Sequence, residues 1–182
     1  MNFIKTAIEG VYIIEPRIFT DARGYFFESY SRAAFEAAGL HYDFVQDNQS
    51  KSCYGTVRGL HFQKGEHAQA KLVRVLKGTV LDVAVDIRRA SPTYGQHVAV
   101  ELSAENNRQL MIPRGFAHGF SVLSETAVFA YKCDNLYCKE SEGGIRFDDP
   151  TLAIDWRIDM SRALTSDKDK LHPYFAEFET CF

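Results

Sequence analysis

The chain has 182 residues, of which 46% are hydrophobic and 25% are charged. These proportions are ordinary for a soluble globular protein, and the length suffices for one domain with a sizeable core. Because 21 Lys and Arg side chains stand against 24 Asp and Glu side chains, the net charge is -3. A chain with this net charge does not attract nucleic acid through its overall electrostatic field, so any site that binds an anion must be local.

The sequence offers no recognisable signal for secretion or membrane insertion. Its start, MNFIKTAIEG, lacks a charged region followed by an apolar run, and no apolar run approaches roughly 18 residues. Four cysteines, at positions 53, 133, 138 and 181, are too few and too irregular for a disulfide framework or a zinc cage. We expect a cytoplasmic protein with free thiols that binds neither membranes nor nucleic acid.

The N-terminal segments predict extended structure around a turn. Residues 11–18, VYIIEPRI, form a β-branched strand signal that Pro16 confines to a sheet edge or a bulge. Residues 19–24 predict a turn, and residues 25–30 resume the extended pattern.

Residues 31–38 give the strongest helix signal, with Ser31 as the N-cap and Gly39 at the C-terminal end. Eight short strands are then predicted in quick succession, over residues 44–48, 56–62, 71–76, 79–87, 97–102, 110–113, 117–123 and 127–133. Many short strands separated by glycine, proline or polar pairs predict a mainly β chain, folded as a sandwich or barrel.

The C-terminal part changes character. Residues 148–156 predict a loop that ends on an aromatic anchor, and residues 165–170 resemble a helix start capped by Thr165 or Ser166. We therefore expect a single domain over residues 1–182, with a barrel core over about 44–135 and a tail of loops and short helices.

The stretch 57–75, VRGLHFQKGEHAQAKLVRV, puts polar groups on a predicted pair of buried strands. Strand alternation divides the first strand into two faces, with Gly59, His61 and Gln63 on one and Arg58, Leu60 and Phe62 on the other. His61 then suits general acid–base work, and Lys71 of the next strand needs an anionic partner. The alternative is a core histidine bonded to a carbonyl and a lysine that extends to solvent.

Two further strands carry polar groups among apolar ones. His118 shares a predicted face with two phenylalanines and a valine, and Tyr131 shares one with Phe129 and Cys133. Each unpaired polar group inside a barrel would cost on the order of 1–3 kcal/mol, so these residues are best explained as the lining of one pocket. A carboxylate of the tail, packed beside a histidine, could orient its ring; the alternative is a charge at a helix start.

A metal site is the competing interpretation of the same histidines. Residues 113–118, PRGFAH, resemble the second cupin motif, but the place of the first motif reads HFQ at 61–63 in place of HxH. A transition-metal site needs about three protein ligands, and His61, His67 and His118 form such a set only if spacing is ignored. We expect no metal.

Seven segments together resemble the dTDP-4-dehydrorhamnose 3,5-epimerase family of cofactor-free cupin-fold enzymes. They are FTDARGYFFES (19–29), FVQDNQSKS (44–52), VRGLHFQ (57–63), AQAKLVRVLKGTVLDVAVDIR (68–88), PRGFAHGF (113–120), YKCDN (131–135) and GGIRFDDPTLAIDW (143–156). The resemblance runs from Val11 to Asp169 and implies a cupin-like jelly roll, with a dTDP-4-keto-6-deoxy sugar as substrate and no cofactor.

The resemblance implies four catalytic residues. His61 matches the family's base, Asp169 the carboxylate paired with it, Tyr131 the acid of the opposite face, and Lys71 the lysine beside the ketone oxygen. Carbons 3 and 5 both neighbour the ketone, so one cation could stabilise both enolates, while inversion calls for proton-transfer groups on opposite walls.

Eight further residues are implied as substrate contacts: Phe19, Arg23, Glu28, Gln46, Asn48, Arg58, His118 and Tyr137. The arginines would meet the diphosphate and the aromatic rings would flank the thymine. The family's N-terminal strand crosses to a partner, so a homodimer with a shared active site is implied.

Departures from the family pattern are Thr56, Gln49 and Phe147, none of them on the proposed proton path. These departures leave open the range of substrates and the alternative that the enzyme inverts carbon 3 alone. Two further hypotheses are a metal-dependent cupin enzyme and a non-catalytic module that binds a sugar nucleotide.

Overall fold

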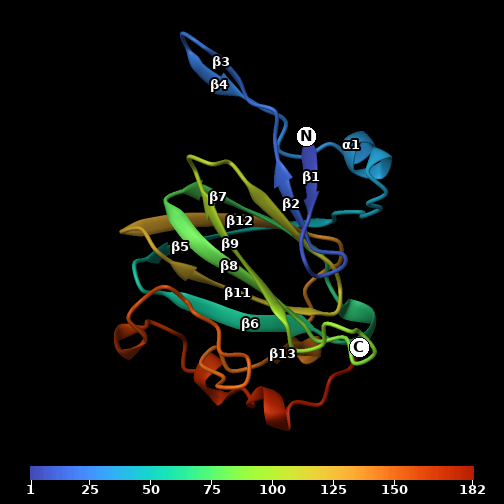
Figure 1. Ribbon diagram of the computed structural model, residues 1–182, viewed down its shortest axis with the longest axis vertical. Helices are drawn as coiled ribbons and strands as arrows, with labels where there is room; N and C mark the ends of the chain where they lie inside the picture. The colour runs from blue at the N-terminus through green and yellow to red at the C-terminus, as the bar shows by residue number, and fades with distance from the viewer.

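Two antiparallel β-sheets packed face to face make up the computed structural model, which describes residues 1–182 (Figure 1). The first sheet has six strands in the spatial order β1 (Asn2–Lys5), β2 (Tyr12–Glu15), β10 (Gln109–Ile112), β7 (Lys71–Lys77), β12 (Thr126–Cys133) and β5 (Gln46–Cys53). The second has five strands in the order β13 (Glu142–Gly144), β6 (Val57–Gln63), β11 (Phe116–Val122), β8 (Thr79–Asp86) and β9 (His97–Ser103). The predicted mainly β sandwich is confirmed.

The largest apolar cluster fills the space between the sheets. Its 15 buried residues include Val73 and Val75 of β7, whose alternation with Lys71 predicted an inward face. Phe120 of β11 stacks on Phe129 of β12 with ring centroids 4.2 Å apart, so the two sheets meet through aromatic contact. Burial of this apolar surface is the main term that holds the sheets together.

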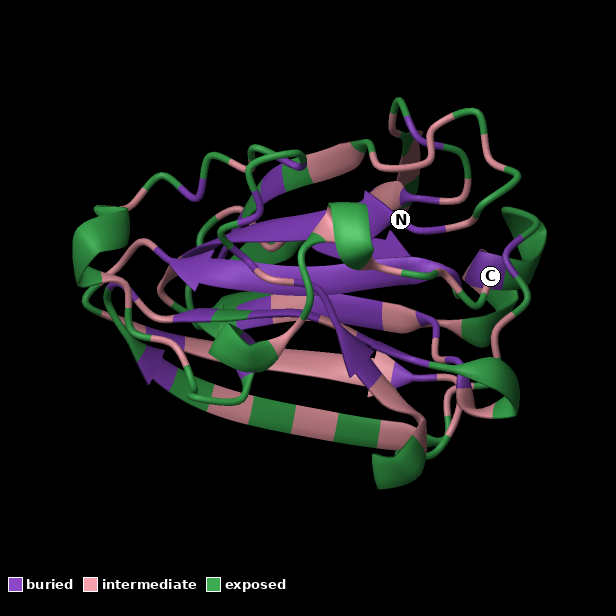
Figure 2. Cartoon of the chain, turned by 90° about the horizontal axis from the view of Figure 1, so that it is seen from below, coloured by how far each residue is buried: buried purple, intermediate pink, exposed green.

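The C-terminal segment covers the outer face of the five-stranded sheet, as the lower part of Figure 1 shows. Trp156 is 1% exposed, and its indole N–H donates to the Phe147 carbonyl at 2.7 Å, so the predicted aromatic anchor is confirmed. Strand β11 is therefore buried along its whole length, whereas the edge strand β5 alternates between half-buried and exposed residues (Figure 2).

Helix α1 (Arg32–Ala37) forms where the sequence predicts it. The Ser31 hydroxyl accepts a hydrogen bond from the Ala34 N–H, and Gly39 has a φ of +78° after the last turn. Phe35 of this helix, 1% exposed, packs in a six-residue cluster on the outer face of the six-stranded sheet.

All eight strands predicted between residues 44 and 133 are present, the first of them longer than predicted because β5 continues to Cys53. Strands β1 and β13 were not predicted. Residues 19–24, predicted as a turn, instead belong to a hairpin of β3 (Phe19–Asp21) and β4 (Gly24–Phe26). None of the helices combines the length and the apolar character that crossing a bilayer requires.

The remaining helical turns are short 3₁₀ segments: η1 (Gly65–His67), η2 (Lys139–Ser141), η3 (Met160–Arg162), η4 (Asp169–Leu171) and η5 (Phe175–Glu177). The helix start predicted in the tail is therefore a single turn. Its N-cap is Lys168, so the predicted cap at Thr165 or Ser166 is wrong, although the Ser166 hydroxyl accepts the Asp169 N–H at 3.1 Å.

A bulge in β6 changes which of its side chains share a face. His61 pairs with His118 of β11 but Arg58 pairs with Phe120, so three steps along β6 match two along β11. The prediction that Arg58 lies opposite His61 is therefore wrong: both line one cavity, whereas Leu60 packs in the outer cluster under the tail. Alternation fails here because a bulge adds one residue to the two-residue period.

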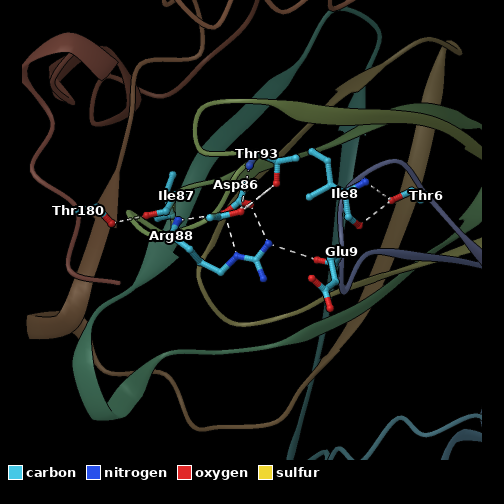
Figure 3. A network of polar contacts seen from close by, with 9 residues as sticks. Thr6, Ile8, Glu9, Asp86, Ile87, Arg88, Thr93 and Thr180 are labelled. Atoms are coloured by element: carbon cyan, nitrogen blue, oxygen red, sulfur yellow. Dashed lines mark hydrogen bonds and ion pairs between the residues drawn. The ribbon is translucent and has the colours of Figure 1, made fainter.

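Asp86, the last residue of β8, and the two residues after it connect three segments of the chain (Figure 3). Its carboxylate accepts hydrogen bonds from the Arg88 guanidinium at 2.7 Å and from the Thr93 hydroxyl at 2.7 Å. Arg88 also donates to the Glu9 carbonyl at 3.3 Å. The Thr180 hydroxyl donates to the carbonyl of Ile87, which lies between Asp86 and Arg88 in the sequence. The first turn of the chain and its last residues are thereby tied to one end of the sandwich.

Candidate active site

A cavity of about 280 Å³ lies between the two sheets and is lined from both of them. Six predicted site residues line it, namely Asn48, Arg58, His61, Lys71, His118 and Tyr131. His61 belongs to β6 of the five-stranded sheet, and Tyr131 belongs to β12 of the six-stranded sheet. The two predicted proton-transfer groups therefore stand on opposite walls of one cavity.

The carboxylate of Asp169 lies against the imidazole of His61, with Oδ1 2.7 Å from Nε2. The Gly59 N–H donates to the other carboxylate oxygen at 3.4 Å, and Asp169 is 3% exposed. Burial by itself raises the pKa of Asp169, but its hydrogen bonds with His61, Ser166 and Gly59 outweigh burial and leave that pKa below its usual value. An ionised carboxylate in this position fixes the orientation of the imidazole ring through their hydrogen bond.

His172 stands beside this pair and was not singled out from the sequence. Its ring centroid is 5.8 Å from that of His61, and its Nε2 is 3.9 Å from Asp169 Oδ1. Burial, together with the nearby His61, lowers the pKa of His172. The residue lies in the irregular tail, where no strand or helix period marks one side chain as inward.

Lys71 and Tyr131 lie together on the six-stranded wall, with the Lys71 Nζ 5.8 Å from the centroid of the Tyr131 ring. Burial lowers the pKa of Lys71, and the nearby Cys133 and Asp82 offset part of that effect. Burial raises the pKa of Tyr131, which keeps its phenol protonated at neutral pH and available as a proton donor.

His118 forms a buried pair with Asp82 of the neighbouring strand β8, at 2.9 Å between Nε2 and Oδ2. Burial lowers the pKa of His118, against the opposing effect of Asp82. Asp82 was missed in the sequence, although an acidic residue in the middle of the apolar run TVLDVAVD was a usable signal. Its second carboxylate oxygen, Oδ1, is buried without a hydrogen-bond partner.

A second cavity of about 410 Å³ adjoins the first, because Arg58 and His61 line both. Its other side is formed by residues 164–169 of the tail. The Arg58 guanidinium donates to the Ser52 hydroxyl at 3.1 Å, which leaves most of its donors free. The Arg58 guanidinium is therefore a cation shared by the two cavities.

Gln46, Asn48 and Tyr137 form a hydrogen-bonded chain beside the first cavity. The Gln46 amide donates to the Asn48 side-chain oxygen at 3.1 Å and accepts the Tyr137 N–H at 3.0 Å. The Tyr137 hydroxyl donates to Glu142 at 3.1 Å, and Glu142 is in turn paired with Lys168 of the tail. Glu142 and Lys168 were missed because both sit in segments without a periodic pattern.

Phe19, Arg23 and Glu28 are not brought to this cavity. They lie in or just after the β3–β4 hairpin, which projects from the body of the molecule at the top of Figure 1. Phe19 is 51% exposed, and Arg23 contacts only Asp21 of the same hairpin, at 2.6 Å. Within one chain these three residues therefore cannot contact a ligand bound beside His61.

The three histidines weighed as metal ligands do not come together. His67 bonds to the Ser141 hydroxyl at 3.0 Å and His118 bonds to Asp82 at 2.9 Å, so each already has another partner. The set of potential ligands that does converge is His61, Asp169 and His172, whose ligand atoms all lie within 4.8 Å of one another.

A family model described as dTDP-4-dehydrorhamnose 3,5-epimerase matches residues 5–177, which include every cavity residue named above. The chain belongs to the dTDP-4-dehydrorhamnose 3,5-epimerase family. The family relationship confirms the resemblance found in the sequence.

Relatives of the epimerase family agree with this assignment. The chain is 55% identical over 174 residues to the 3,5-epimerase of Salmonella typhimurium, which covers 95% of this chain and 94% of the relative. The crystal structure of the enzyme from Elizabethkingia anophelis is 57% identical, with a TM-score of 0.93 and 97% of each chain covered. The enzyme from Legionella pneumophila, in complex with dTDP-4-keto-L-rhamnose, is 50% identical with a TM-score of 0.93, and covers 98% of this chain and 94% of its own. The expected cupin-like fold is thereby confirmed.

Proposed function

We propose that this chain inverts carbons 3 and 5 of dTDP-4-dehydro-6-deoxy-D-glucose and so makes dTDP-4-dehydro-L-rhamnose for dTDP-L-rhamnose biosynthesis. The chain is an isomerase of the 3,5-epimerase family. The observation that carries the mechanism is the placement of the His61–Asp169 pair and of Tyr131 on opposite walls of one cavity. The scheme uses only side chains of the protein and needs no cofactor.

In the first half-reaction, His61 removes the proton from a carbon next to the ketone. The C–H electron pair moves into an enolate whose charge rests on the ketone oxygen, and the imidazolium that forms is stabilised by the ionised Asp169. The ammonium of Lys71 is the cation available to that oxygen, an effect typically worth about 3–4 kcal/mol per donor. Because both carbons flank one ketone, the same two groups serve both steps.

In the second half-reaction, Tyr131 returns a proton to the opposite face of the carbon. The elevated pKa of its buried phenol supports this assignment, since the proton is present at neutral pH. His61 must then release its proton to water and the phenolate must regain one before the next carbon reacts. A base and an acid on the same wall would return the proton to the face that it left.

The remaining predicted residues are assigned to binding. Arg58, at the junction of the two cavities, is placed to meet the diphosphate with a planar guanidinium fork. Tyr137 offers its exposed ring to the thymine, while Gln46, Asn48 and His118 offer polar contacts to nucleotide and sugar.

We propose that Phe19, Arg23 and Glu28 act on the active site of a second copy of the chain, in a homodimer with shared sites. The hairpin that carries them supports this assignment, because Phe19, Tyr25 and Phe26 are each more than half exposed. Three large rings left in water on one hairpin mark an interaction surface. The four free cysteines suit a reducing compartment, and we place the enzyme in the cytoplasm.

Solvent exchange tests the function. The enzyme is incubated in heavy water with dTDP-4-dehydro-6-deoxy-D-glucose, and deuterium in the product is located by NMR. We expect label at both carbons. Label at carbon 3 alone would identify a 3-epimerase, tight binding without label would identify a binding module, and activity lost to a chelator and restored by iron or zinc would identify a metal-dependent enzyme.

A further inference from the structure

We propose that His61, Asp169 and His172 form a binding site for a divalent transition-metal ion such as Zn²⁺, and that an ion bound there inhibits the enzyme. The ligand atoms of the three side chains lie within 4.8 Å of one another. The proposal rests on the proposed function, because inhibition follows only if His61 is the base.

The His172 ring nitrogen nearest Asp169 makes no hydrogen bond in the structure. His172 Nε2 is buried and has no hydrogen-bond partner, since Asp169 Oδ1 at 3.9 Å is too distant. Buried polar atoms are normally satisfied, and one that is not calls for a water, an ion or a functional explanation. A metal ion between His172 and Asp169 would accept the lone pair of this nitrogen.

Of the two distances from Asp169 Oδ1 to the histidine nitrogens, one is shorter and one is longer than the distance between neighbouring ligand atoms of tetrahedral zinc. Zn–N and Zn–O bonds of about 2.0–2.1 Å place neighbouring ligand atoms about 3.3 Å apart. Asp169 Oδ1 is 2.7 Å from His61 Nε2 and 3.9 Å from His172 Nε2, so these two separations must each change by about 0.6 Å, while the two histidine ligand atoms lie within 4.8 Å of each other. His172 packs over Gly144, where any Cβ would lie 2.4 Å from its ring, so the glycine makes room for this histidine.

The donor set determines which ions fit. Two imidazoles and one carboxylate suit Zn²⁺, Co²⁺ or Ni²⁺ and do not suit Mg²⁺ or Ca²⁺, which prefer oxygen ligands. His61 also lines the substrate cavity, and His61 and Asp169 both line the cavity that adjoins it. The ion binds the lone pair of His61 Nε2, so the proton of the neutral ring stands on the other nitrogen, Nδ1, which then has no lone pair with which to remove a substrate proton.

Cobalt binding tests the site without reference to activity. The full-length protein is stripped with EDTA and titrated with Co²⁺, and the visible absorption of the bound ion is recorded, followed by competition with Zn²⁺. We expect wild-type protein to show a saturable signal and His172→Phe, which keeps a ring over Gly144, to bind at least about tenfold to a hundredfold more weakly. The matched control is His67→Gln, another half-buried histidine outside the cluster, which should bind as wild type does.

The zinc dependence of deuterium exchange then tests inhibition, each variant being compared with its own metal-free rate. Zn²⁺ should abolish exchange by the wild type, EDTA should restore it, and His172→Phe should need at least about tenfold more Zn²⁺. Should His172→Phe not fold, as judged by circular dichroism, His172→Gln takes its place. If the cobalt spectrum shows thiolate charge-transfer bands that are unchanged in the His172 variant, the ion binds to cysteine and the proposed ligands are wrong. Activation of the enzyme by Zn²⁺ would contradict the proposed inhibition. The two proposals can also fail separately. If the metal-free wild type exchanges no deuterium, but the His172→Phe variant still binds cobalt more weakly than the wild type, the proposed function is refuted and the metal site stands.

Discussion

The pKa values of single site residues depend on two causes, burial and a specific hydrogen-bond partner. Tyr131 and Lys71 lie on one wall, where burial raises the pKa of the phenol and lowers that of the ammonium. On the other wall, hydrogen bonding keeps the pKa of Asp169 low in spite of burial. Desolvation and a specific partner are the two causes that divide acid, base and electrostatic roles among these groups.

Substitution of the proposed acid and base should separate proton removal from inversion. In heavy water, His61→Ala should lose exchange and turnover by about 10²–10⁴-fold, the usual share of a general base. Tyr131→Phe keeps the base, so it should still exchange deuterium into the substrate on the original face while forming little epimer. Mass spectrometry of recovered substrate and NMR of product distinguish the two results.

Equal loss of exchange in the two variants would argue against opposite roles for His61 and Tyr131. Retention of the wild-type exchange rate in His61→Ala would remove the base assignment altogether.

Among the elements, β6 approaches its neighbour β11 closely at Gly59. A Cβ at Gly59 would lie 2.5 Å from the Gly119 Cα of β11, and Gly59 has a φ of +132°. Gly59→Ala should therefore force the two strands apart, at about 1–3 kcal/mol for overpacking plus the backbone strain. Urea unfolding should show this loss, and exchange should slow because Arg58 and His61 move with the strand.

Gly39→Ala is the matched control, because Gly39 also has a positive φ, +78°, but nothing lies within 4 Å of its Cβ position. A Gly59→Ala variant no less stable than Gly39→Ala would contradict the close approach of β6 and β11.

The end of β8 should give the protein a measurable acid sensitivity. Burial alone would raise the pKa of Asp86, but bonds from Arg88, Ser91 and Thr93 lower it from 3.8 to about 2. A folded-state pKa below the unfolded value contributes stability that is present above pH 3.8 and is lost as the pH falls through about 2. Asp86→Asn should cost on the order of 2 kcal/mol at pH 7, and the difference from wild type should shrink between pH 4 and 2.

Urea unfolding at several pH values measures this difference. Asp47→Asn serves as the control, since Asp47 pairs with Lys132 at 2.9 Å but is 71% exposed, and exposed pairs contribute about 0–1 kcal/mol. A loss in Asp86→Asn that is equal at pH 7 and pH 2 would exclude the carboxylate charge as its cause.

At the scale of the whole molecule, the chain's own β3–β4 hairpin does not lie at the cavity between the sheets, and the hairpin of a second copy is proposed to complete that site. If Arg23 acts on the partner's site, mixing Arg23→Ala with His61→Ala should restore activity that neither variant has alone. Random pairing makes half of the dimers mixed, each with one intact site, so about a quarter of wild-type activity should return. Sedimentation of each variant confirms that dimers form.

A mixture with no more activity than its components, although mixed dimers are present, would show that Arg23 acts within its own chain. Deletion of the hairpin provides a second test, because it should yield a monomer if the exposed rings form the interface.

The sequence by itself determined the eight strands between residues 44 and 133 and the capped helix, because periodicity and caps are local signals. Family motifs, also local, led us to propose His61, Lys71, Tyr131 and Asp169 as site residues. Only the tertiary structure decided that Arg58 joins His61, because a one-residue bulge depends on how β6 meets β11. It alone also decided that Asp82 pairs with His118 and that His172 stands beside Asp169. Those contacts join residues 36 positions apart or lie in an aperiodic tail, and side chains there are placed by long-range packing that no local pattern encodes.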